Sequence, residues 1–364
     1  MRIYNNILET VGNTPIVRFN EVCSSYSSSE RKKSRIFGKL EFWNPGRSVK
    51  DRIALQMINC AEEEQLLHKQ SIILESSSGN TGIGLSLVSR VKGYSNIIVV
   101  DQNCPSEKLK LLRALGAKVI MLTSGDQRAD DLTERRIDLV NALQEIDENI
   151  FVPNQYQNHH APEAHYLYTA EEIISFMEET GLFFQTVVIS VGTGGTISGV
   201  SKRLKEYDSS IRVVGVEPEG STLFGGEKGA YLQQGPGNYF VPTNLIYEHI
   251  DLGLKVSDQN AFNMCRRLAL HEGLLTGGSS GAVVHAAIEL PDAVEGNTLC
   301  ILPDGGEKYL DSIYSDEWLA KHGIVLNQSN YNQLLEVNID NVQDYRELAE
   351  RLKNEGGYAN GVLR

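Results

Sequence analysis

The chain has 364 residues and a formal net charge of −13, and its length is typical of two or three domains. An acidic surface repels phosphate backbones, which argues against nucleic acid as a partner. No run approaches the roughly 20 apolar residues that span a bilayer, and the first residues lack the basic and apolar regions of a signal peptide. We therefore expect a cytoplasmic protein without a membrane partner.

Short apolar runs rich in isoleucine and valine alternate with segments of helical spacing. Such runs are typical of strands that are buried on both faces of a parallel sheet. A helix over 107–115 is predicted to end at Gly116 as a C-cap. Strands are predicted at 71–75, 97–101, 118–122, 187–191, 212–217 and 299–303. The alternation predicts an α/β fold with mostly parallel sheets.

The segment 44–52, NPGRSVKDR, places a lysine at the start of a predicted helix. Asn-Pro-Gly predicts a turn, and Ser48 can cap the helix that follows. Lys50 then falls in the first turn, where a cation opposes the helix dipole. An amine nucleophile needs a lowered pKa, so Lys50 is a candidate nucleophile. The alternative is an exposed lysine in a basic turn.

The segment 75–82, ESSSGNTG, joins the end of a predicted strand to the start of a helix. Its serines, Asn80 and Thr81 offer hydroxyl, amide and backbone donors, which suit a substrate carboxylate at a helix N-terminus. The alternative is that the serines only cap the helix.

The segment 192–196, GTGGT, repeats this arrangement after the run 187–191. Backbone N–H groups and the helix N-terminus would form a phosphate cup, and a plain tight turn is the alternative. The segment is not a Rossmann fingerprint, because Ile197 occupies the third glycine position. It is not a Walker motif either, because no Lys-Ser/Thr pair follows it. A third loop, TGGSSGAV at 276–283, contains Ser279. Its neutral hydroxyl could contact a ligand, and the alternative is that it only caps the helix.

The five cysteines lie far apart and form no CxxC pair. They are therefore predicted to be small buried side chains rather than disulfides or a zinc site. The adjacent His159 and His160 are not part of an HExxH motif, so no metal is expected.

Taken together, these motifs resemble the fold-type II pyridoxal-phosphate enzymes of the cysteine synthase and cystathionine β-synthase family. The resemblance covers about residues 5–320. It includes ETVGNTPIVRF, KLEFWNPGRSVKDR, ESSSGNTGIGL, NQYQNHHAPEAHY, VGTGGTISGV, VGVEP, EGLLTGGSSGA and ILPDGGEKYL. It implies two open, mostly parallel twisted sheets flanked by helices, similar to the tryptophan synthase β subunit, with pyridoxal 5′-phosphate as cofactor.

The resemblance also implies roles for individual residues. Lys50 would form the Schiff base with the cofactor, Asn80 would bind its 3-hydroxyl, and Ser279 would face its pyridine nitrogen. The 5′-phosphate would be held by Gly192, Thr193, Gly194, Gly195 and Thr196. The substrate carboxylate would be held by Ser77, Ser78, Thr81 and Gln155.

These roles imply β-replacement on an O-activated L-serine, either O-acetylserine or O-phosphoserine, through an α-aminoacrylate. Lys50 would remove the α-proton as a general base, and the cofactor would be the electron sink. The expected nucleophile is sulfide, as in cysteine synthase, or an amino acid. Three alternatives stay open: a cystathionine β-synthase-like condensation with homocysteine, synthesis of a diaminopropionate precursor with glutamate, and a serine or threonine dehydratase. The segments ILPDGGEKYLDSIYSDEWL and VEPEGSTLFGG resemble the branch that joins O-phosphoserine to glutamate.

Arg47 departs from the small residue that is common at this position in the family. We hypothesise that it binds a substrate anion; a solvated side chain is the alternative. The expected domains are a small one over 48–157, a large one over 1–47 plus 158–325, and an extension over 326–364 with an amphipathic helix at 340–355. The resemblance implies a homodimer.

Overall fold

The structure is a computed structural model that describes residues 3–24, 35–123, 132–290 and 296–327. Contacts divide the chain into Met1–Val325 and Leu326–Arg364, and every element described below belongs to the first unit. The helix predicted at 340–355 lies outside the described residues.

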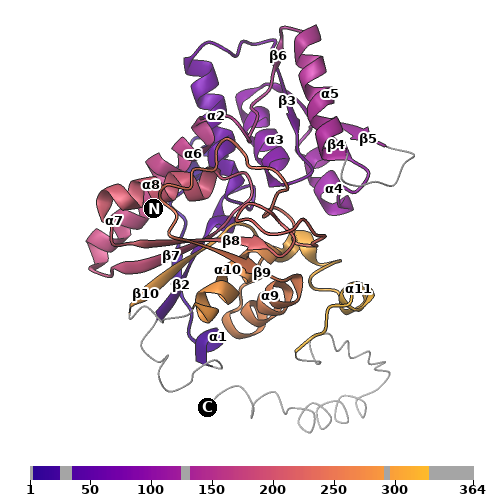
Figure 1. The fold of residues 1–364 in the computed structure, drawn as a ribbon. Coiled ribbons are helices and arrows are strands. Elements are labelled where there is room, and N and C mark those ends of the chain that lie inside the picture. The colour runs from indigo at the N-terminus through magenta and orange to yellow at the C-terminus, as the bar shows by residue number, and fades with distance from the viewer. Residues whose placement is uncertain (1–2, 25–34, 124–131, 291–295, 328–364) are drawn as a thin grey trace, which may run out of the picture. The chain divides into compact units, whose positions relative to one another are not determined.

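The described strands form two sheets (Figure 1). One sheet has six strands in the order β1-β2-β10-β7-β8-β9, and the other has four in the order β5-β4-β3-β6. All neighbouring strands are parallel except β1 and β2. The strands are β1 (Ile16–Arg18), β2 (Arg35–Leu40), β3 (Ile72–Ser76), β4 (Ser95–Asp101), β5 (Lys118–Leu122), β6 (Ile150–Phe151), β7 (Phe184–Ser190), β8 (Arg212–Pro218), β9 (Leu252–Val256) and β10 (Asn297–Leu302).

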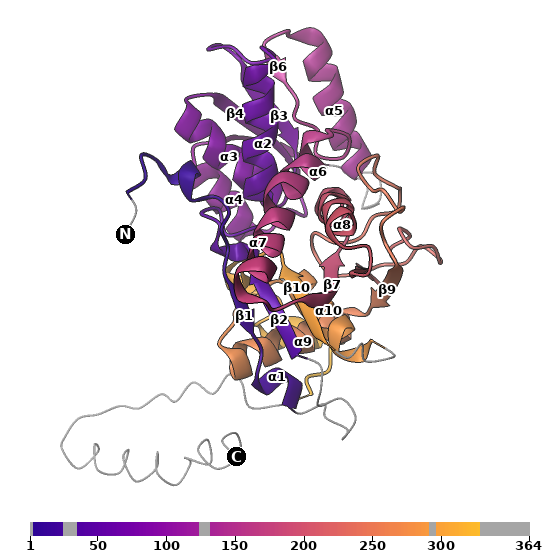
Figure 2. The ribbon, with the colours of Figure 1, turned by 90° about the vertical axis from the view of Figure 1, so that its left-hand side faces the viewer.

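Helices cover the faces of both sheets (Figure 2). A π-helix, His165–Thr169, joins two of them, and short 3-10 helices lie at Ile7–Thr10, Glu41–Trp43 and Gly306–Tyr309. The α-helices are α1 (Glu21–Ser24), α2 (Lys50–Glu63), α3 (Asn80–Lys92), α4 (Ser106–Ala114), α5 (Leu132–Ile146), α6 (His160–Ala164), α7 (Ala170–Thr180), α8 (Gly195–Tyr207), α9 (Asp258–Glu272), α10 (Gly278–Glu289) and α11 (Asp316–Lys321). Among the described residues, no helix combines the length and apolar character that a membrane crossing requires.

The central strands of the four-stranded sheet are buried on both faces because they are apolar at successive positions, whereas the edge strand β5 is largely exposed. Ile98 and Val100 of β4 pack with Ile83 of α3 on one face. On the other face, Val99 packs with Val140 of α5. Alternate side chains of a strand point to opposite faces, so this continuous apolar run requires helices on both sides.

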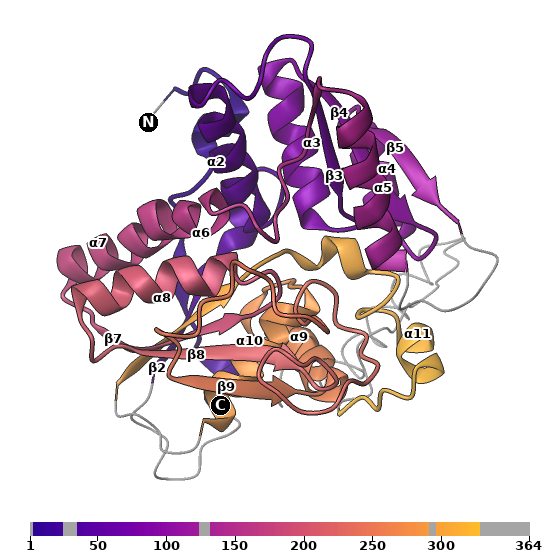
Figure 3. The same cartoon turned by 45° about the horizontal axis from the view of Figure 1, so that its top comes forward.

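The six-stranded sheet has the same layered construction. In Figure 3, α7 and α8 cover one of its faces, and α10 lies on the other with α9 beyond it. Val187 and Ile189 of β7 pack with Ile173 of α7 and Ile197 of α8, in a cluster whose side chains are nearly all inaccessible to water.

The predicted fold class is confirmed: the chain is α/β with two mostly parallel sheets. Each of the six predicted strands occurs within a few residues of its expected position, and 118–122 matches β5. The helix predicted at 107–115 is α4, and Gly116 follows it with φ of 78°. The strands of residues 72–151 form one sheet and the remaining strands form the other, while the predicted domain boundaries stay a prediction.

Candidate functional site

The site lies where strands of both sheets end. Loops after β3, β7 and β10 each lead into a helical segment, and ligands of open α/β sheets bind beyond the carboxyl ends of the strands. One pocket is lined by residues of all three loops and by the start of α2. It brings together the predicted residues Lys50, Asn80, Gly192, Thr193, Gly194, Thr196 and Ser279. Gly195 is the first residue of α8.

Lys50 is the first residue of α2, as the sequence predicts. The Oγ of Ser48 accepts a hydrogen bond from the Lys50 amide at 3.3 Å, but the N-cap of α2 is Val49 rather than the predicted Ser48. Burial removes water from the ammonium group and lowers the pKa of Lys50 to about 8, although the nearby Asp304 carboxylate opposes this shift. Lys50 is therefore deprotonated more readily than an exposed lysine, as a nucleophilic amine requires.

The glycine loop 192–195 leads directly into α8. Gly194 is the N-cap of α8, with φ of 86°, a conformation that side chains other than glycine rarely adopt. A Cβ at Gly194 would lie 2.6 Å from the Leu245 backbone, and one at Gly192 would lie 2.3 Å from the carbonyl oxygen of Gly235. Only glycine fits at both positions. The first backbone N–H groups of α8 have no partner within the helix, so this helix start is suited to binding an anion.

A buried histidine supports this loop, and the sequence analysis missed it. The Nε2 of His165, in the π-helix, lies 3.1 Å from the Oγ1 of Thr196, and its Nδ1 lies 2.9 Å from the Oγ1 of Thr169. Burial, with help from nearby cations, lowers the pKa of His165 to about 3. The ring is therefore neutral near pH 7 and orients the Thr196 hydroxyl without adding charge.

The loop after β3 is used partly for helix capping. The Oγ of Ser77 accepts hydrogen bonds from the amides of Gly79 and Gly82 at 3.3 and 3.1 Å. The Oγ1 of Thr81 donates to the Oε1 of Gln155 at 2.6 Å. None of the four described residues predicted as carboxylate ligands, Ser77, Ser78, Thr81 and Gln155, lines the pocket that contains Lys50.

Arg47 does not line that pocket either. Its side chain is half exposed, and its Nε donates to the Oε1 of Glu307 at 2.9 Å. The guanidinium carbon lies 5.7 Å from the centre of the Phe42 ring. The backbone of Arg47 has φ of 64°, a left-handed conformation that is uncommon for a residue other than glycine.

Asp304, which follows β10, is a site residue that the sequence analysis did not single out. Its Oδ2 accepts hydrogen bonds from the Nδ2 of Asn80 at 2.8 Å and from the hydroxyl of Tyr309 at 2.6 Å. Its Oδ1 is buried and has no hydrogen-bond partner among the described residues. The Nζ of Lys308 donates to the Oδ1 of Asn80 at 2.8 Å, so both ends of the Asn80 amide are held.

Two further buried cations lie beside the site. The Nζ of Lys108 donates to the Oε1 of Gln234 at 2.6 Å, and Gln234 lines the pocket of Lys50. Burial lowers the pKa of Lys108 to about 8. The Nη1 of Arg136 donates to the Oγ of Ser78 at 2.8 Å. No motif marks these residues, because both lie on helices that have no glycine loop.

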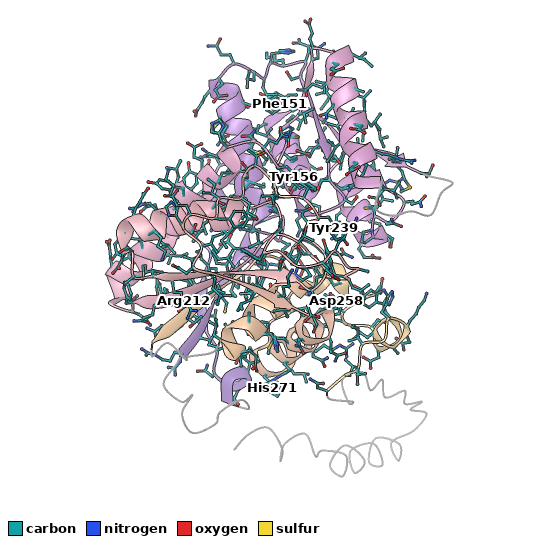
Figure 4. The ribbon with its side chains drawn as sticks, viewed as in Figure 1. Phe151, Tyr156, Arg212, Tyr239, Asp258 and His271 are labelled. Carbon is teal, nitrogen blue, oxygen red and sulfur yellow. The ribbon has the colours of Figure 1, made fainter. Side chains whose placement is uncertain are left out.

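Aromatic side chains lie beside the end of β3. In Figure 4, Tyr156 lies between the two sheets. Its ring packs against Phe240, with 5.4 Å between the ring centres. Both rings line a pocket that also contains Glu75 and Ser76, which end β3. Apolar groups here shield the end of β3 from water.

The donor set fits pyridoxal phosphate. A lysine with a lowered pKa can attach its aldehyde, and the cradle formed by Gly192 and Gly194 faces a helix start that suits its phosphate. Asn80 and Ser279 supply neutral polar groups for its ring.

Comparison with known proteins agrees with this fit. The family model described as pyridoxal-phosphate dependent enzyme matches residues 7–304. A probable cysteine synthase of Bacillus subtilis is 40% identical over 318 residues, which cover 86% of this chain and 98% of the relative. Cystathionine beta-synthase of Apis mellifera is 39% identical over 331 residues, which cover 89% of this chain and 64% of the relative. The chain thus spans just under two thirds of that relative.

Solved structures show the same arrangement. A cysteine synthase of Entamoeba histolytica has a TM-score of 0.78 and 36% identity, and the match covers 86% of this chain and 91% of that structure. An O-acetylserine dependent cystathionine beta-synthase of Helicobacter pylori has a TM-score of 0.76 and 34% identity, with 86% and 100% covered. A hydrogen sulfide-producing enzyme of Fusobacterium nucleatum has a TM-score of 0.77 and 36% identity, with 85% and 100% covered.

Proposed function

We propose, from the premise that this chain belongs to the pyridoxal-phosphate dependent enzymes, that it catalyses β-replacement on an O-activated L-serine with sulfide or an amino acid as nucleophile. One observation carries the proposal. A single pocket is lined by a lysine amine, a glycine loop at the start of α8 and the neutral hydroxyl of Ser279. The relatives named cysteine synthase and cystathionine beta-synthase support this reaction class.

The residues of the pocket have distinct roles in this proposal. When bound, pyridoxal phosphate supplies a reactive carbonyl group and an electron sink for the substrate's α-carbon. The Nζ of Lys50 would hold the cofactor covalently and, once displaced by the substrate's amine, would take the α-proton as a general base. A pKa of about 8 suits this task, because a general base works best when its pKa is close to the working pH.

The remaining residues would position the cofactor and the substrate. Thr193, Thr196 and the amides of residues 192–196 would hold the phosphate, and Asn80 would bind the ring hydroxyl. Ser279 would contact the ring nitrogen; a neutral hydroxyl does not enforce a proton there as a carboxylate would. The substrate carboxylate would be held by Ser77, Ser78, Thr81 and Gln155.

We further propose that the first substrate is O-phosphoserine and that glutamate is the nucleophile, because the segments ILPDGGEKYLDSIYSDEWL and VEPEGSTLFGG resemble the branch that joins these two substrates. Arg136 contacts Ser78 of the carboxylate loop, and Lys108 contacts Gln234 of the pocket. Arg136 also pairs with Asp101, with 3.2 Å between Nε and Oδ2. The two buried cations beside the substrate region favour a dianionic leaving group over a neutral ester. The Arg47 guanidinium is a third candidate for an anion, although it pairs with Glu307.

The test separates the two halves of the reaction. The holoenzyme is incubated with O-phosphoserine or O-acetylserine, first alone and then with sulfide, homocysteine or glutamate. Released phosphate or acetate identifies the leaving group, and mass spectrometry identifies the amino-acid product. We expect phosphate release and a glutamate adduct. Pyruvate and ammonia formed at equal rates with and without every nucleophile would instead indicate a dehydratase.

We also propose a homodimer, which the family resemblance implies, and a cytoplasmic location, which the sequence composition suggests. Light scattering on the purified full chain tests the first. A mass of one chain at micromolar concentration would contradict it.

A further inference from the structure

Three side chains with metal-binding atoms converge at a place separate from the pocket of Lys50. These are Cys60 of α2 and His160 and Glu163 of α6, and one ligand atom of each lies within 4.8 Å of the other two. We call them the Cys60 cluster. It lies ten residues beyond Lys50 along α2, about 15 Å at the rise of an α-helix, and it shares no residue with the pocket of Lys50.

Two packed helices build the Cys60 cluster. Cys60 and Glu64 are four residues apart at the end of α2, and His160 and Glu163 are three residues apart on α6. Residues at these spacings share one face of a helix. Metal sites between helices are commonly built in this way, with ligands one turn apart on facing helices.

Hydrogen bonds orient the imidazole of His160. Its Nε2 lies 3.0 Å from the Oε1 of Glu64, and its Nδ1 lies 2.6 Å from the Oε2 of Glu163. A carboxylate on one ring nitrogen of a metal-binding histidine fixes its tautomer and makes the other nitrogen a better ligand. Glu64 is placed for this role, and Nδ1 faces into the Cys60 cluster.

The side-chain amide of Gln56 lies between the ligand atoms of Cys60 and Glu163. The Nε2 of Gln56 lies 3.3 Å from both the Sγ of Cys60 and the Oε2 of Glu163. Lone pairs of sulfur and oxygen thus converge on one hydrogen-bearing nitrogen. Zinc bonds of about 2.0–2.3 Å place two ligand atoms roughly 3.3–3.7 Å apart. The contact between His160 and Glu163 would open by about 1 Å to admit such an ion.

The charges around Cys60 also favour a cation. The carboxylates of Glu163, Glu63 and Glu64 lie close enough to the Cys60 thiol to act on it electrostatically. A divalent ion would pair with these carboxylates and displace the thiol proton to solvent. A pocket of about 310 Å³ is lined by Glu64 and His160 but not by Cys60 or Glu163, so it meets the Cys60 cluster at His160.

We propose that Cys60, His160 and Glu163 bind one zinc-like divalent ion, with Glu64 orienting His160 and water as the fourth ligand. Sulfur, imidazole and carboxylate together select zinc rather than magnesium or calcium, which prefer oxygen alone. The ion would join α2, which begins at Lys50, to the helical segment that continues into His165 and its contact with Thr196. It would stabilise the protein without touching the reacting groups.

The experiment uses the full-length holoenzyme after removal of metals, titrated with Co²⁺ as a coloured substitute. We expect one Co²⁺ per chain, with the ligand-field absorption of a tetrahedral site in the red and a thiolate-to-metal band, both bleached by Zn²⁺. Cys60→Ser and His160→Asn should abolish these bands. Glu64→Gln should weaken binding about 10- to 100-fold. Cys104→Ser is the matched control, because this second partly buried cysteine lies outside the Cys60 cluster and should leave the spectrum unchanged.

Thermal unfolding gives a readout that is independent of catalysis. Zn²⁺ should raise the Tm of the wild type and of Cys104→Ser by about 3 °C or more and leave Cys60→Ser unchanged. Circular dichroism without metal shows whether each variant is folded. The proposal is overturned if the wild type binds no Co²⁺ at stoichiometric concentration, or if folded Cys60→Ser and His160→Asn both give the wild-type spectrum.

Discussion

The side-chain amide of Asn80 donates a hydrogen bond to the carboxylate of Asp304, with 2.8 Å between Nδ2 and Oδ2. Asn80 begins α3, directly after the loop that follows β3, and Asp304 lies just beyond β10. The bond therefore joins the carboxyl ends of strands from the two sheets. Asp304 also raises the pKa of Lys50, whereas burial lowers it. The same carboxylate therefore holds Asn80 in place and influences the protonation of the Lys50 amine.

The first prediction concerns the charge of Lys50. Asp304→Asn keeps a hydrogen-bond acceptor for Asn80 but removes the negative charge, so the pKa of Lys50 should fall below about 8. Attachment of pyridoxal phosphate requires the neutral amine, and its rate should rise as the pH passes through that pKa. For the wild-type apoenzyme, we expect the rate of cofactor attachment to reach half of its maximum near pH 8. For Asp304→Asn, we expect this midpoint at a lower pH.

Asp208→Asn is the control for this experiment. Its carboxylate is exposed and bonds to Ser210, so the wild-type midpoint should be kept. A midpoint for Asp304→Asn equal to or above that of the wild type would show that the Asp304 charge does not control this amine.

The second prediction compares two glycines of positive φ. Gly194→Ala would place a Cβ 2.6 Å from the Leu245 backbone, whereas Gly181, at φ of 68°, has open space around its position. Both variants should lose about 1–2 kcal/mol from the left-handed conformation. Only Gly194→Ala should also displace the start of α8 and weaken pyridoxal-phosphate binding about tenfold or more, since overpacking costs about 1–3 kcal/mol. Fluorescence titration of the two apoenzymes measures this difference. Equal cofactor affinities would contradict a role for the loop in holding phosphate.

The sequence predicted the sheets and the loops because local patterns encode them. The run 97–101 has four successive apolar residues before Asp101, which is typical of a strand that is buried on both faces. Lys50 could be placed at a helix start because Asn-Pro-Gly and Ser48 precede it. The glycine loop at 192–196 was visible for the same local reason.

The remaining contacts depend on residues that are far apart in the chain. Asp304 meets Asn80 across 224 positions, and no periodicity reveals such a pair. Ser77 is similar, because whether its hydroxyl faces a ligand or caps α3 depends on loop geometry. The Cys60 cluster has no sequence signature either, since its ligands come from two helices and match no zinc spacing.

The third prediction compares two arginines as anion ligands. Arg136 is buried beside Ser78 and pairs with Asp101 at 3.2 Å, while Arg47 is half exposed and pairs with Glu307. Arg136→Gln should lower kcat/KM for O-phosphoserine about 10- to 100-fold, because a charge-assisted hydrogen bond to a charged group contributes about 1.5–3 kcal/mol, and should change kcat/KM for O-acetylserine less. Arg47→Ala is measured on both substrates in parallel. If a variant loses the same factor in kcat/KM on both substrates, the arginine that it replaces does not recognise the phosphate group.

The fourth prediction concerns stability and rests on two adjacent glutamates of α7. The carboxylate of Glu172 accepts hydrogen bonds from the Nη1 and Nη2 of Arg52 at 2.6 and 2.8 Å and from the Nζ of Lys39 at 2.6 Å. Lys39 and Arg52 are almost completely buried. Removing one partner of a buried ion network leaves uncompensated charge, which costs about 3–5 kcal/mol. Glu172→Gln should lower the free energy of unfolding by about that amount.

Glu171→Gln is the matched control for this comparison. Glu171 also lies in the first turn of α7, so both substitutions remove the same interaction with the helix dipole. Its carboxylate is partly exposed and pairs with Arg203 at the surface, where an ion pair contributes about 0–1 kcal/mol. Urea denaturation of the two variants therefore isolates the effect of burial. A difference between them below about 1 kcal/mol would mean that water reaches the Arg52 network and screens it.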